Sequence, residues 1–423
     1  MFSEEEKNSF TRRKANRQCM LRKGFFQLLA NIYFNILIGG VVMINKFVMP
    51  EVIFGHNSLH QVGESCIRLG AKNVLIVTDQ GVMEAGWADV VEKSCKSAEL
   101  SYTSFNEITT NPKDYEAELG ANVYVENECD AIIGIGGGSA IDVAKAVAIL
   151  VTNGGTISEY EGVDQIKKPL PPLIMAATTA GSGSEVSQFS VIVDSKKKKK
   201  MTIISKSLVP DIAIIDPLTL STKHDHLTAS TGLDVLTHAI ESYVSVAATA
   251  LTEVYSRNAI RLVSQYLRPS VASKLNKEAK EHMAMASLQA GLAFSNAILG
   301  AVHAMSHSVG GRYPMLHGDV NAVLLPHVME FNLLAAPQKF CDIAELLGEH
   351  IGGLSVYEAG KKAIEHVKQL SLDIGAPQSL SEMGLEEKII RELSCLALND
   401  ACMITNPRDI KEEDVERLFH QAL

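Results

Sequence analysis

The chain has 423 residues, enough for two or three domains, each with a core of its own. Hydrophobic residues make up 46% and charged residues 21%, a balance that excludes an intrinsically disordered chain. The 49 acidic residues outnumber the 39 Lys and Arg residues, so the net charge of −10 disfavours nucleic acid as a partner. The seven cysteines form no Cys-x-x-Cys pair, which indicates a reduced, cytoplasmic protein without a disulfide framework.

The first 42 residues differ in character from the rest. Residues 1–24 are polar and basic, and a largely apolar stretch follows from Phe25 to Met43. This order is typical of a signal peptide or an N-terminal anchor. Three amide side chains interrupt the apolar run, and no small-residue cleavage site follows it cleanly. We therefore expect translation to start at Met43, residues 1–42 to be an extension of doubtful status, and no membrane association. The anchor interpretation stays open.

From Met43 to residue 221, strand-like and helix-like segments alternate. We expect strands at 73–79, 100–105, 130–135, 172–177, 186–193, 201–205 and 212–215, and helices at 83–97, 114–128 and 139–151. This alternation predicts a mostly parallel, doubly wound sheet, in which ligands bind beyond the carboxyl ends of the strands. The Lys196–Lys200 run lies between two strand-like segments. It predicts a solvated hairpin tip, from which one lysine can turn inward toward a phosphate.

From residue 222 onward, long helical patterns replace the strand patterns. The sequence therefore predicts an α/β domain over residues 43–221 and an all-helical domain over residues 222–423. No repeat and no low-complexity linker separates the two parts, so we expect the domains to pack closely.

Two loops in the first half are typical of phosphate binding. Gly134-Ile-Gly-Gly-Gly-Ser-Ala-Ile-Asp142 joins a strand to a helix, where glycines admit a pyrophosphate and the helix N-terminus offers free N–H groups. Thr178-Thr-Ala-Gly-Ser-Gly-Ser-Glu185 also follows a strand. Either loop alone can be a tight turn, but two together favour a phosphate-bearing cofactor. Asp79, at the end of a strand, is either a turn residue or the acceptor for a ribose diol, which would repel a 2′-phosphate.

The helical half contains two pairs of residues with i, i+4 spacing. Asp234 and His238 would project from one face of a helix. His303 and His307 share the spacing on a long helix that we expect from about residue 281 to residue 310. A lone histidine is usually a packing residue, but two such pairs in an apolar region favour a metal site.

A third histidine completes the candidate ligand set. His317 follows the expected helix after a short loop, which is long enough to fold back along the last two helical turns. One carboxylate oxygen and three imidazole nitrogens suit Fe(II) or Zn(II), with a coordination position left open for substrate. The predicted ligands are Asp234, His238, His303 and His317.

With these residues in view, the chain from Met43 to the C-terminus resembles the iron-containing (group III) alcohol dehydrogenases. The resemblance covers roughly nine tenths of the chain. It rests on the two glycine loops above and on Gly232-Leu-Asp-Val-Leu-Thr-His-Ala-Ile-Glu241, Val302-His-Ala-Met-Ser-His307, His317-Gly318 and Thr405-Asn-Pro-Arg408. It implies a Rossmann-like α/β N-terminal domain, an all-α C-terminal domain and an active site in the cleft between them.

The resemblance also implies an activity and roles for single residues. The activity is NAD-dependent oxidation of a primary alcohol, or reduction of its aldehyde, by a homodimer or higher homo-oligomer that holds Fe2+ or, alternatively, Zn2+. The metal ligands match the four predicted residues, His307 matches a histidine of proton relay, and Cys402 matches a residue close to substrate. The matching cofactor contacts are Asp79, Asn111, Gly137, Gly138, Ser139, Thr178, Thr179, Ser182 and Lys200.

Two departures from the family pattern leave the substrate open. Arg312 stands where the family often has an aromatic or aliphatic residue, and Leu316 stands where a proline often precedes the His-Gly pair. If Arg312 faces the cleft, the substrate can be an anionic aldehyde such as sulfoacetaldehyde. The same fold also admits a zinc-dependent glycerol dehydrogenase-like enzyme, a metal-free maleylacetate reductase-like enzyme, and a non-catalytic protein that binds metal or nucleotide. His238, as a fourth ligand, favours the iron type.

Overall fold

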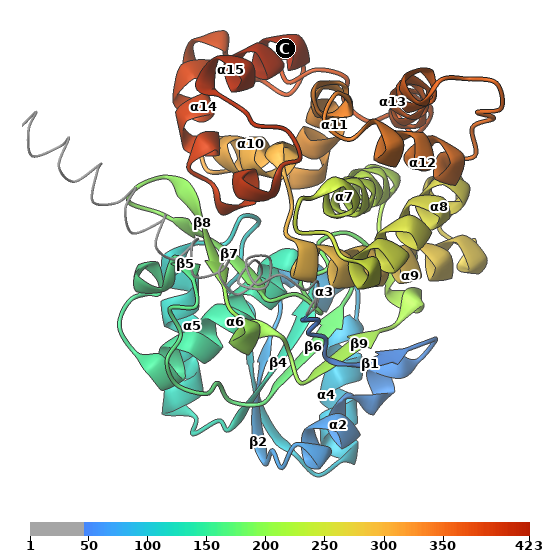
Figure 1. Ribbon diagram of the computed structural model, residues 1–423. Helices are drawn as coiled ribbons and strands as arrows, with labels where there is room; N and C mark the ends of the chain where they lie inside the picture. Colours follow the sequence, from blue (N-terminus) through green and yellow to red (C-terminus); the bar gives the residue numbers. More distant parts are fainter. Residues whose placement is uncertain (1–45) are drawn as a thin grey trace, which may run out of the picture.

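The computed structural model describes residues 46–423 (Figure 1), so the expectations for residues 1–42 lie outside the described part of the chain. A sheet flanked by helices forms the lower half of the molecule in Figure 1, and helices alone form the upper half. This arrangement confirms the predicted fold class, an α/β N-terminal part followed by an all-helical C-terminal part.

The main sheet has six strands in the order β1-β9-β6-β4-β2-β3, and all neighbouring strands are parallel. The carboxyl ends of the strands therefore meet at one edge of the sheet. The strands are β1 (Glu51–Phe54), β9 (Ile212–Ile215), β6 (Leu173–Ala177), β4 (Ala131–Gly136), β2 (Asn73–Val77) and β3 (Ser101–Phe105).

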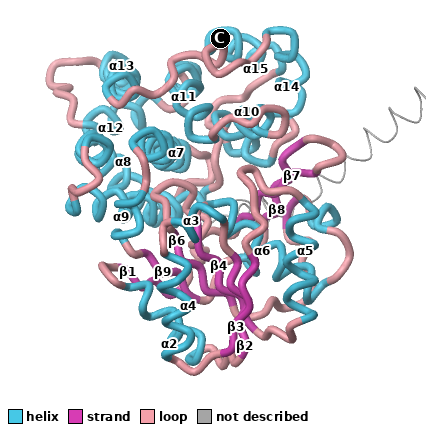
Figure 2. Tube along the Cα trace, turned by 180° about the vertical axis from the view of Figure 1, so that it is seen from behind, coloured by secondary structure: helices cyan, strands magenta, loops and turns pink. Residues whose placement is uncertain are grey.

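Helices cover both faces of this sheet (Figure 2). Successive residues of a strand point to opposite faces, so Val74 and Ile76 join one apolar core while Leu75 and Val77 join the other. The first core includes α2 (Val62–Arg68), α3 (Gln80–Glu84) and α4 (Trp87–Ser97), and the second includes α5 (Asp114–Glu126) and α6 (Gly138–Asn153). The doubly wound prediction is confirmed. One detail differs, because Gly86 has a φ of +79° and separates α3 from α4 within the expected helix at 83–97.

A smaller sheet lies beside the main one. It contains β5 (Gly162–Val163), β7 (Phe189–Asp194) and β8 (Lys199–Ile204), and β7 and β8 form an antiparallel hairpin. The turn at 195–198 carries three exposed lysines, as expected for a hairpin tip. Lys200 is the lysine that turns inward: its Cε would lie 2.9 Å from a Cβ added at Gly310.

The part of the chain after β9 is helical. Its α-helices are α7 (Asp225–Val244), α8 (Ala250–Ala272), α9 (Lys277–Ala297), α10 (Ala301–Gly310), α11 (His317–Leu333), α12 (Pro337–Leu347), α13 (Val356–Asp373), α14 (Ile390–Leu398) and α15 (Glu412–Ala422). The change from strand to helix falls between Ile215 and Asp225, around the residue where the sequence pattern changes.

The prediction of one long helix from about residue 281 to residue 310 is wrong. The chain forms two helices there, α9 and α10, with a bend of 100° between them. Ile298 ends α9 with a φ of +61°, a conformation that cannot continue a right-handed helix. His303 consequently lies in the first turn of a new helix.

The helical half and the sheet share one apolar core. Ile204, Ala213 and Ile215 from the strands belong to the same buried cluster as residues of α7 to α15. Close packing of the two halves, as expected from the absence of a linker, is therefore observed. Within residues 46–423, no single helix has both the length and the apolar composition needed to cross a membrane.

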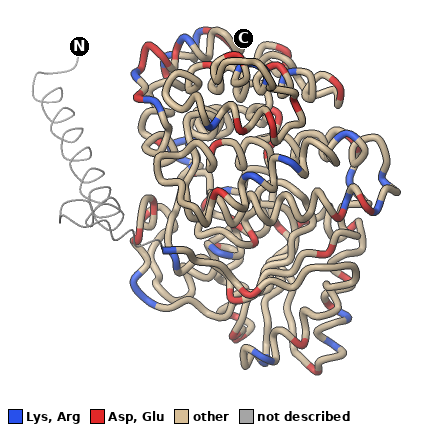
Figure 3. The backbone as a smooth tube through the Cα atoms, turned by 45° about the vertical axis from the view of Figure 1, so that its right-hand side comes forward, with Lys and Arg blue, Asp and Glu red and all other residues tan. Residues whose placement is uncertain are grey.

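The charged side chains are mixed in sign along the chain, and the cysteines form no disulfides within the described residues. In the view of Figure 3, Lys and Arg positions are interspersed with Asp and Glu positions. The six cysteines within residues 46–423 are all free, and five of them are buried.

Candidate metal centre and cofactor loops

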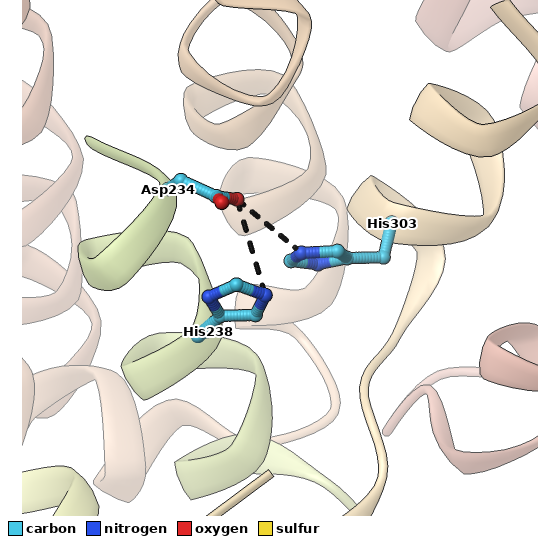
Figure 4. Close-up of side chains that lie close together, drawn as sticks. All are labelled: Asp234, His238 and His303. Atoms are coloured by element: carbon cyan, nitrogen blue, oxygen red, sulfur yellow. Dashed lines mark ion pairs between the residues drawn. The ribbon is translucent and has the colours of Figure 1, made fainter. Parts of the chain in front are cut away.

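Helix α7 supplies two of the four predicted metal ligands. Asp234 and His238 are one helical turn apart, so both side chains leave α7 on the same side (Figure 4). His303 approaches them from the first turn of α10 (Figure 4). Its Nε2 lies 3.6 Å from Asp234 Oδ1, and His238 Nε2 lies 3.9 Å from the same oxygen. All three side chains are buried.

The fourth predicted ligand comes from the start of α11. The loop after α10 returns the chain so that His317 Nε2 lies 3.9 Å from Asp234 Oδ1. The Ser306 hydroxyl lies 2.9 Å from His317 Nδ1 and orients the ring. The structure thus brings all four residues to one point, although they come from three helices.

These residues fit a divalent metal ion. Around an ion with metal–ligand bonds of about 2.1 Å, neighbouring donor atoms lie roughly 3.4 Å apart in tetrahedral geometry. The observed 3.6–3.9 Å from Asp234 Oδ1 to the three Nε2 atoms is close to that spacing. Burial alone would raise the pKa of Asp234, but His238, His303 and His317 hold it well below its usual range, so the carboxylate stays charged.

Asn321 faces the same point and was missed by sequence reasoning. It lies on α11, one turn after His317, and its Nδ2 is 2.7 Å from Asp234 Oδ1. The same nitrogen lies 3.2 Å from His303 Nε2 and 3.3 Å from His317 Nε2. The buried Asn321 Oδ1 has no hydrogen-bond partner among the described residues. The i, i+4 spacing from His317 was the available signal.

A second cluster lies beside the metal ligands. His307 Nδ1 is 2.9 Å from Asp400 Oδ2, and the His307 ring stacks on the His317 ring with centroids 5.4 Å apart. Burial would raise the pKa of Asp400, but His307 lowers it below its usual range. Cys402 is fully buried next to this pair, and burial raises the pKa of its thiol far above normal, so it stays protonated. Asp400 was not predicted, because nothing in its spacing marks it.

The two glycine loops lie against each other at the carboxyl ends of the adjacent strands β4 and β6. A Cβ added at Gly138 would lie 3.0 Å from Ser182 Cβ, and one at Gly137 would lie 3.4 Å from Thr179 Oγ1. Any larger side chain at these two positions would therefore close the space between the loops. The Thr178 N–H donates to the Gly136 carbonyl over 2.9 Å.

Asp79 reaches the same edge from the end of β2. It caps α3, because its Oδ1 accepts from the Val82 N–H over 3.0 Å. Its Oδ2 would lie 3.1 Å from a Cβ at Gly136. Asp79, the two glycine loops and Ser139 in the first turn of α6 are thus neighbours, as a nucleotide site requires.

Lys200 belongs to strand β8 of the β7–β8 hairpin, and Asn111 lies beside the same hairpin. Asn111 has a φ of +54° and precedes Pro112, whose carbonyl accepts from the Val193 N–H over 2.7 Å. Val193 pairs with Lys200 across the hairpin. Burial lowers the pKa of Lys200 to about 8, although Asp142, Asp234 and Asp400 oppose that shift. The Lys200 ammonium group lies against the end of α10, where its Nζ would be 3.1 Å from a Cβ added at Gly310.

A hollow near Thr179 opens between the two halves of the molecule. Its walls come from the loop after β6, from residues 220–223 and from α7, α8 and α9. The lining residues are Thr179, Ala180, Leu220, Lys223, Thr228, Thr231, Ser270, Lys280 and Met283.

Arg312 and Leu316, the two departures from the family pattern, flank the loop before α11. Arg312 forms an ion pair with Glu392 of α14, which already supplies its counter-charge. Leu316 is the residue before the first turn of α11, and its φ of −65° and ψ of 132° are angles that a proline also adopts, so leucine here leaves the backbone of the family pattern unchanged.

Two features occur together in this structure: a parallel α/β sheet with two glycine loops, and a helical part with a carboxylate and three histidines. Together they indicate the class of metal-dependent dehydrogenases. The comparisons agree. The model for "Iron-containing alcohol dehydrogenase" matches residues 50–217, and that for "Fe-containing alcohol dehydrogenase family, C-terminal" matches residues 228–423. The chain belongs to the iron-containing alcohol dehydrogenase family and is an oxidoreductase of alcohols and aldehydes.

Individual relatives match along almost their whole length. The 1,3-propanediol dehydrogenase of Klebsiella pneumoniae is 43% identical over 379 residues, which are 89% of this chain and 98% of that protein. The NAD-dependent methanol dehydrogenase of Bacillus methanolicus is 40% identical over 381 residues, 90% of this chain and 100% of that protein. A crystal structure of 1,3-propanediol oxidoreductase has a TM-score of 0.88 at 42% identity and covers 90% of this chain and 100% of that one.

Proposed function

We propose that this protein is an NAD-dependent, iron-dependent dehydrogenase that interconverts a primary alcohol and its aldehyde. The observation that carries the proposal is the convergence of Asp234, His238, His303 and His317 on one buried point in the helical half. The names of the relatives support NAD as the cofactor and small alcohols as substrates. Zn2+ is the alternative ion for the same donor set.

The chemistry divides between cofactors and side chains. When bound, the metal supplies Lewis acidity that lowers the pKa of the alcohol, and NAD supplies the hydride acceptor. His307 holds its Nδ1 proton against Asp400, which leaves Nε2 free to accept the proton that the alcohol loses. His307 is thus proposed as the relay for one proton per turnover, and Asp400 as the residue that fixes its tautomer.

We place the cofactor contacts at the edge of the sheet where the glycine loops meet. Because the metal ligands lie in the helical part, the proposed active site is the cleft between the two domains, 43–221 and 222–423. Asp79 would bind the ribose diol, and Lys200 and Asn111 would act from the hairpin side. The phosphate contacts would be Gly137, Gly138, Ser139, Thr178, Thr179 and Ser182. We further propose that the protein is cytoplasmic and that it forms a homodimer or a higher homo-oligomer. The molecule it binds, apart from its cofactors, would be the small alcohol or aldehyde substrate.

The alternative substrates are not favoured. The expectation of an anionic aldehyde depends on Arg312, whose guanidinium is instead paired with Glu392 of α14. His238 Nε2 lies 3.9 Å from Asp234 Oδ1, inside a four-residue donor set, which argues against a metal-free reductase. Glycerol is not favoured either, since the relatives at 40–43% identity act by name on methanol and 1,3-propanediol.

The direct test is metal-dependent turnover. Chelator-treated protein, reloaded with Fe2+ under anaerobic conditions or with Zn2+, is mixed with NAD+ and a panel of short primary alcohols and diols, and NADH absorbance is recorded. We expect NADH production only after reloading, with aldehyde reduction by NADH in the reverse assay. Full turnover by metal-free protein, or none with any alcohol or aldehyde, would contradict the proposal.

Asp79 should select NAD over NADP. A carboxylate beside the 2′ position repels a 2′-phosphate, and like-charge apposition of about 1–3 kcal/mol gives a preference of roughly ten- to hundredfold. Asp79→Gly should reduce this preference, so that the kcat/KM with NAD divided by the kcat/KM with NADP moves closer to one. Because glycine also removes the cap of α3, Asp79→Ser is the matched control: it keeps a capping oxygen and should narrow the ratio similarly. An equal or better kcat/KM of the wild type with NADP would show that Asp79 has another role.

A further inference from the structure

Glu241 is a buried carboxylate to which neither the substrate chemistry nor the cofactor loops give a role. It lies on α7 about one turn after His238, and only 3% of its surface is exposed. Its two oxygens accept from backbone N–H groups at the start of α10. The bonds are Gly300 N–H at 3.0 Å, Val302 N–H at 2.7 Å and His303 N–H at 3.4 Å.

These contacts replace the cap that α10 lacks. The residue before α10 is Gly300, which has no side chain to accept the free N–H groups of the first turn. A carboxylate at this place also interacts favourably with the helix dipole. The absence of a side chain at Gly300 is itself required, because a Cβ there would lie 2.8 Å from Glu241 Oε1. Glu241 and Gly300 therefore form one unit that starts α10 at the bend.

The same carboxylate holds the ring of a predicted metal ligand. Glu241 Oε2 lies 2.7 Å from His303 Nδ1, while His303 Nε2 faces Asp234 Oδ1 at 3.6 Å. A proton held at Nδ1 leaves the Nε2 lone pair for the ion. Asp234 and Glu241 are two turns apart on α7, so a single helix supplies a ligand and the support for a ligand on another helix.

We propose that Glu241 is a positioning residue of the metal centre, which fixes both the tautomer and the place of His303 by anchoring the first turn of α10. This inference rests on the proposed function, in which His303 binds the metal. The competing view is that Glu241 only caps a helix. The two views differ in one measurable quantity, the affinity of the folded protein for a divalent metal.

The test uses Glu241→Gln, which keeps the size of the side chain but weakens its acceptor oxygen toward the His303 ring. Glu349→Gln is the matched control. Glu349 Oε1 lies 2.8 Å from His366 Nδ1 in the same helical half, so the control weakens a carboxylate–histidine contact of the same kind, partly exposed and away from the metal ligands. The probe is Co2+ alone, titrated against a competing chelator, with the visible spectrum of bound Co2+, the thermal unfolding of metal-free protein and NADH binding as further readouts.

We expect Glu241→Gln to weaken Co2+ binding by about 10- to 100-fold and to change the Co2+ spectrum, as the loss of an outer-shell partner does. Glu349→Gln should bind Co2+ like the wild type, and NADH binding should be unchanged in both. If Glu241→Gln binds Co2+ with the affinity and spectrum of the wild type, even with a lower melting temperature, Glu241 only caps a helix and the inference is overturned.

Gly300→Ala provides a second test if Glu241→Gln does not fold. The added Cβ displaces the carboxylate while every charged and metal-binding side chain remains, so Co2+ binding should again weaken by about 10- to 100-fold. A folded Gly300→Ala with wild-type affinity, or loss of helical structure in both variants, would overturn the inference. No Co2+ binding by the wild type would instead overturn the proposed function, which makes the two failures distinguishable.

Discussion

Replacement of His303 or Asp234 by alanine is expected to remove the bound metal and nearly all turnover, while the protein still binds NADH. The ligands lie in a helical half whose apolar core extends over α7 to α15, so loss of one ligand leaves the core intact. The glycine loops proposed for the nucleotide belong to the other half. Metal content by elemental analysis, turnover and NADH affinity, measured on the same preparations, check this prediction.

His307→Ala is the control for the division of roles between neighbouring histidines. Its Nδ1 faces Asp400 and not Asp234, so this variant should keep its metal. A proton relay contributes about 10²–10⁴-fold to the rate, and water can replace part of it, so turnover should fall without vanishing. A full equivalent of metal in His303→Ala, or loss of metal from His307→Ala, would contradict the assignment.

Lys145→Met should destabilise the fold strongly, by about 3–5 kcal/mol. The fully buried Lys145 Nζ donates to the carbonyls of Ser184 (2.6 Å), Ser187 (2.6 Å) and Phe189 (2.9 Å). It thereby ties the loop after β6 to α6. Methionine fills the space but leaves these buried carbonyls without their donor. Urea unfolding monitored by circular dichroism gives the free energy of unfolding.

Lys280→Met is the matched comparison for Lys145→Met. Lys280 is also buried, but its Nζ donates to a single carbonyl, that of Ser270, over 2.7 Å. Its removal should therefore cost only about 1–2 kcal/mol. NADH affinity should fall in Lys145→Met, because the loop that carries Ser182 loses its anchor, and should stay closer to wild type in Lys280→Met. Equal free energies of unfolding for the two variants would contradict the prediction, because the loss of stability would then not depend on the number of carbonyl contacts.

The sequence by itself determined the features that depend on short spacings. The alternation of apolar runs with helical patterns specified the parallel sheet and its two covering layers, because strand and helix periods are local properties of the chain. The i, i+4 spacing of Asp234 and His238 placed both side chains on one side of α7. The glycine loops followed from residue type and position after a strand, since both signals are contained in a few consecutive residues.

Only the tertiary structure decided which elements meet. The bend at Ile298 divides the expected long helix, and the carboxylate that starts α10 comes from Glu241, 62 residues from His303. Asp400 reaches His307 across 93 residues, and Asn321 reaches Asp234 across 87. Spacing along the chain defines the face of one helix but not the partner of that face. Contacts over such separations arise from the packing of whole helices around a shared core, and the sequence pattern of each helix alone does not contain them.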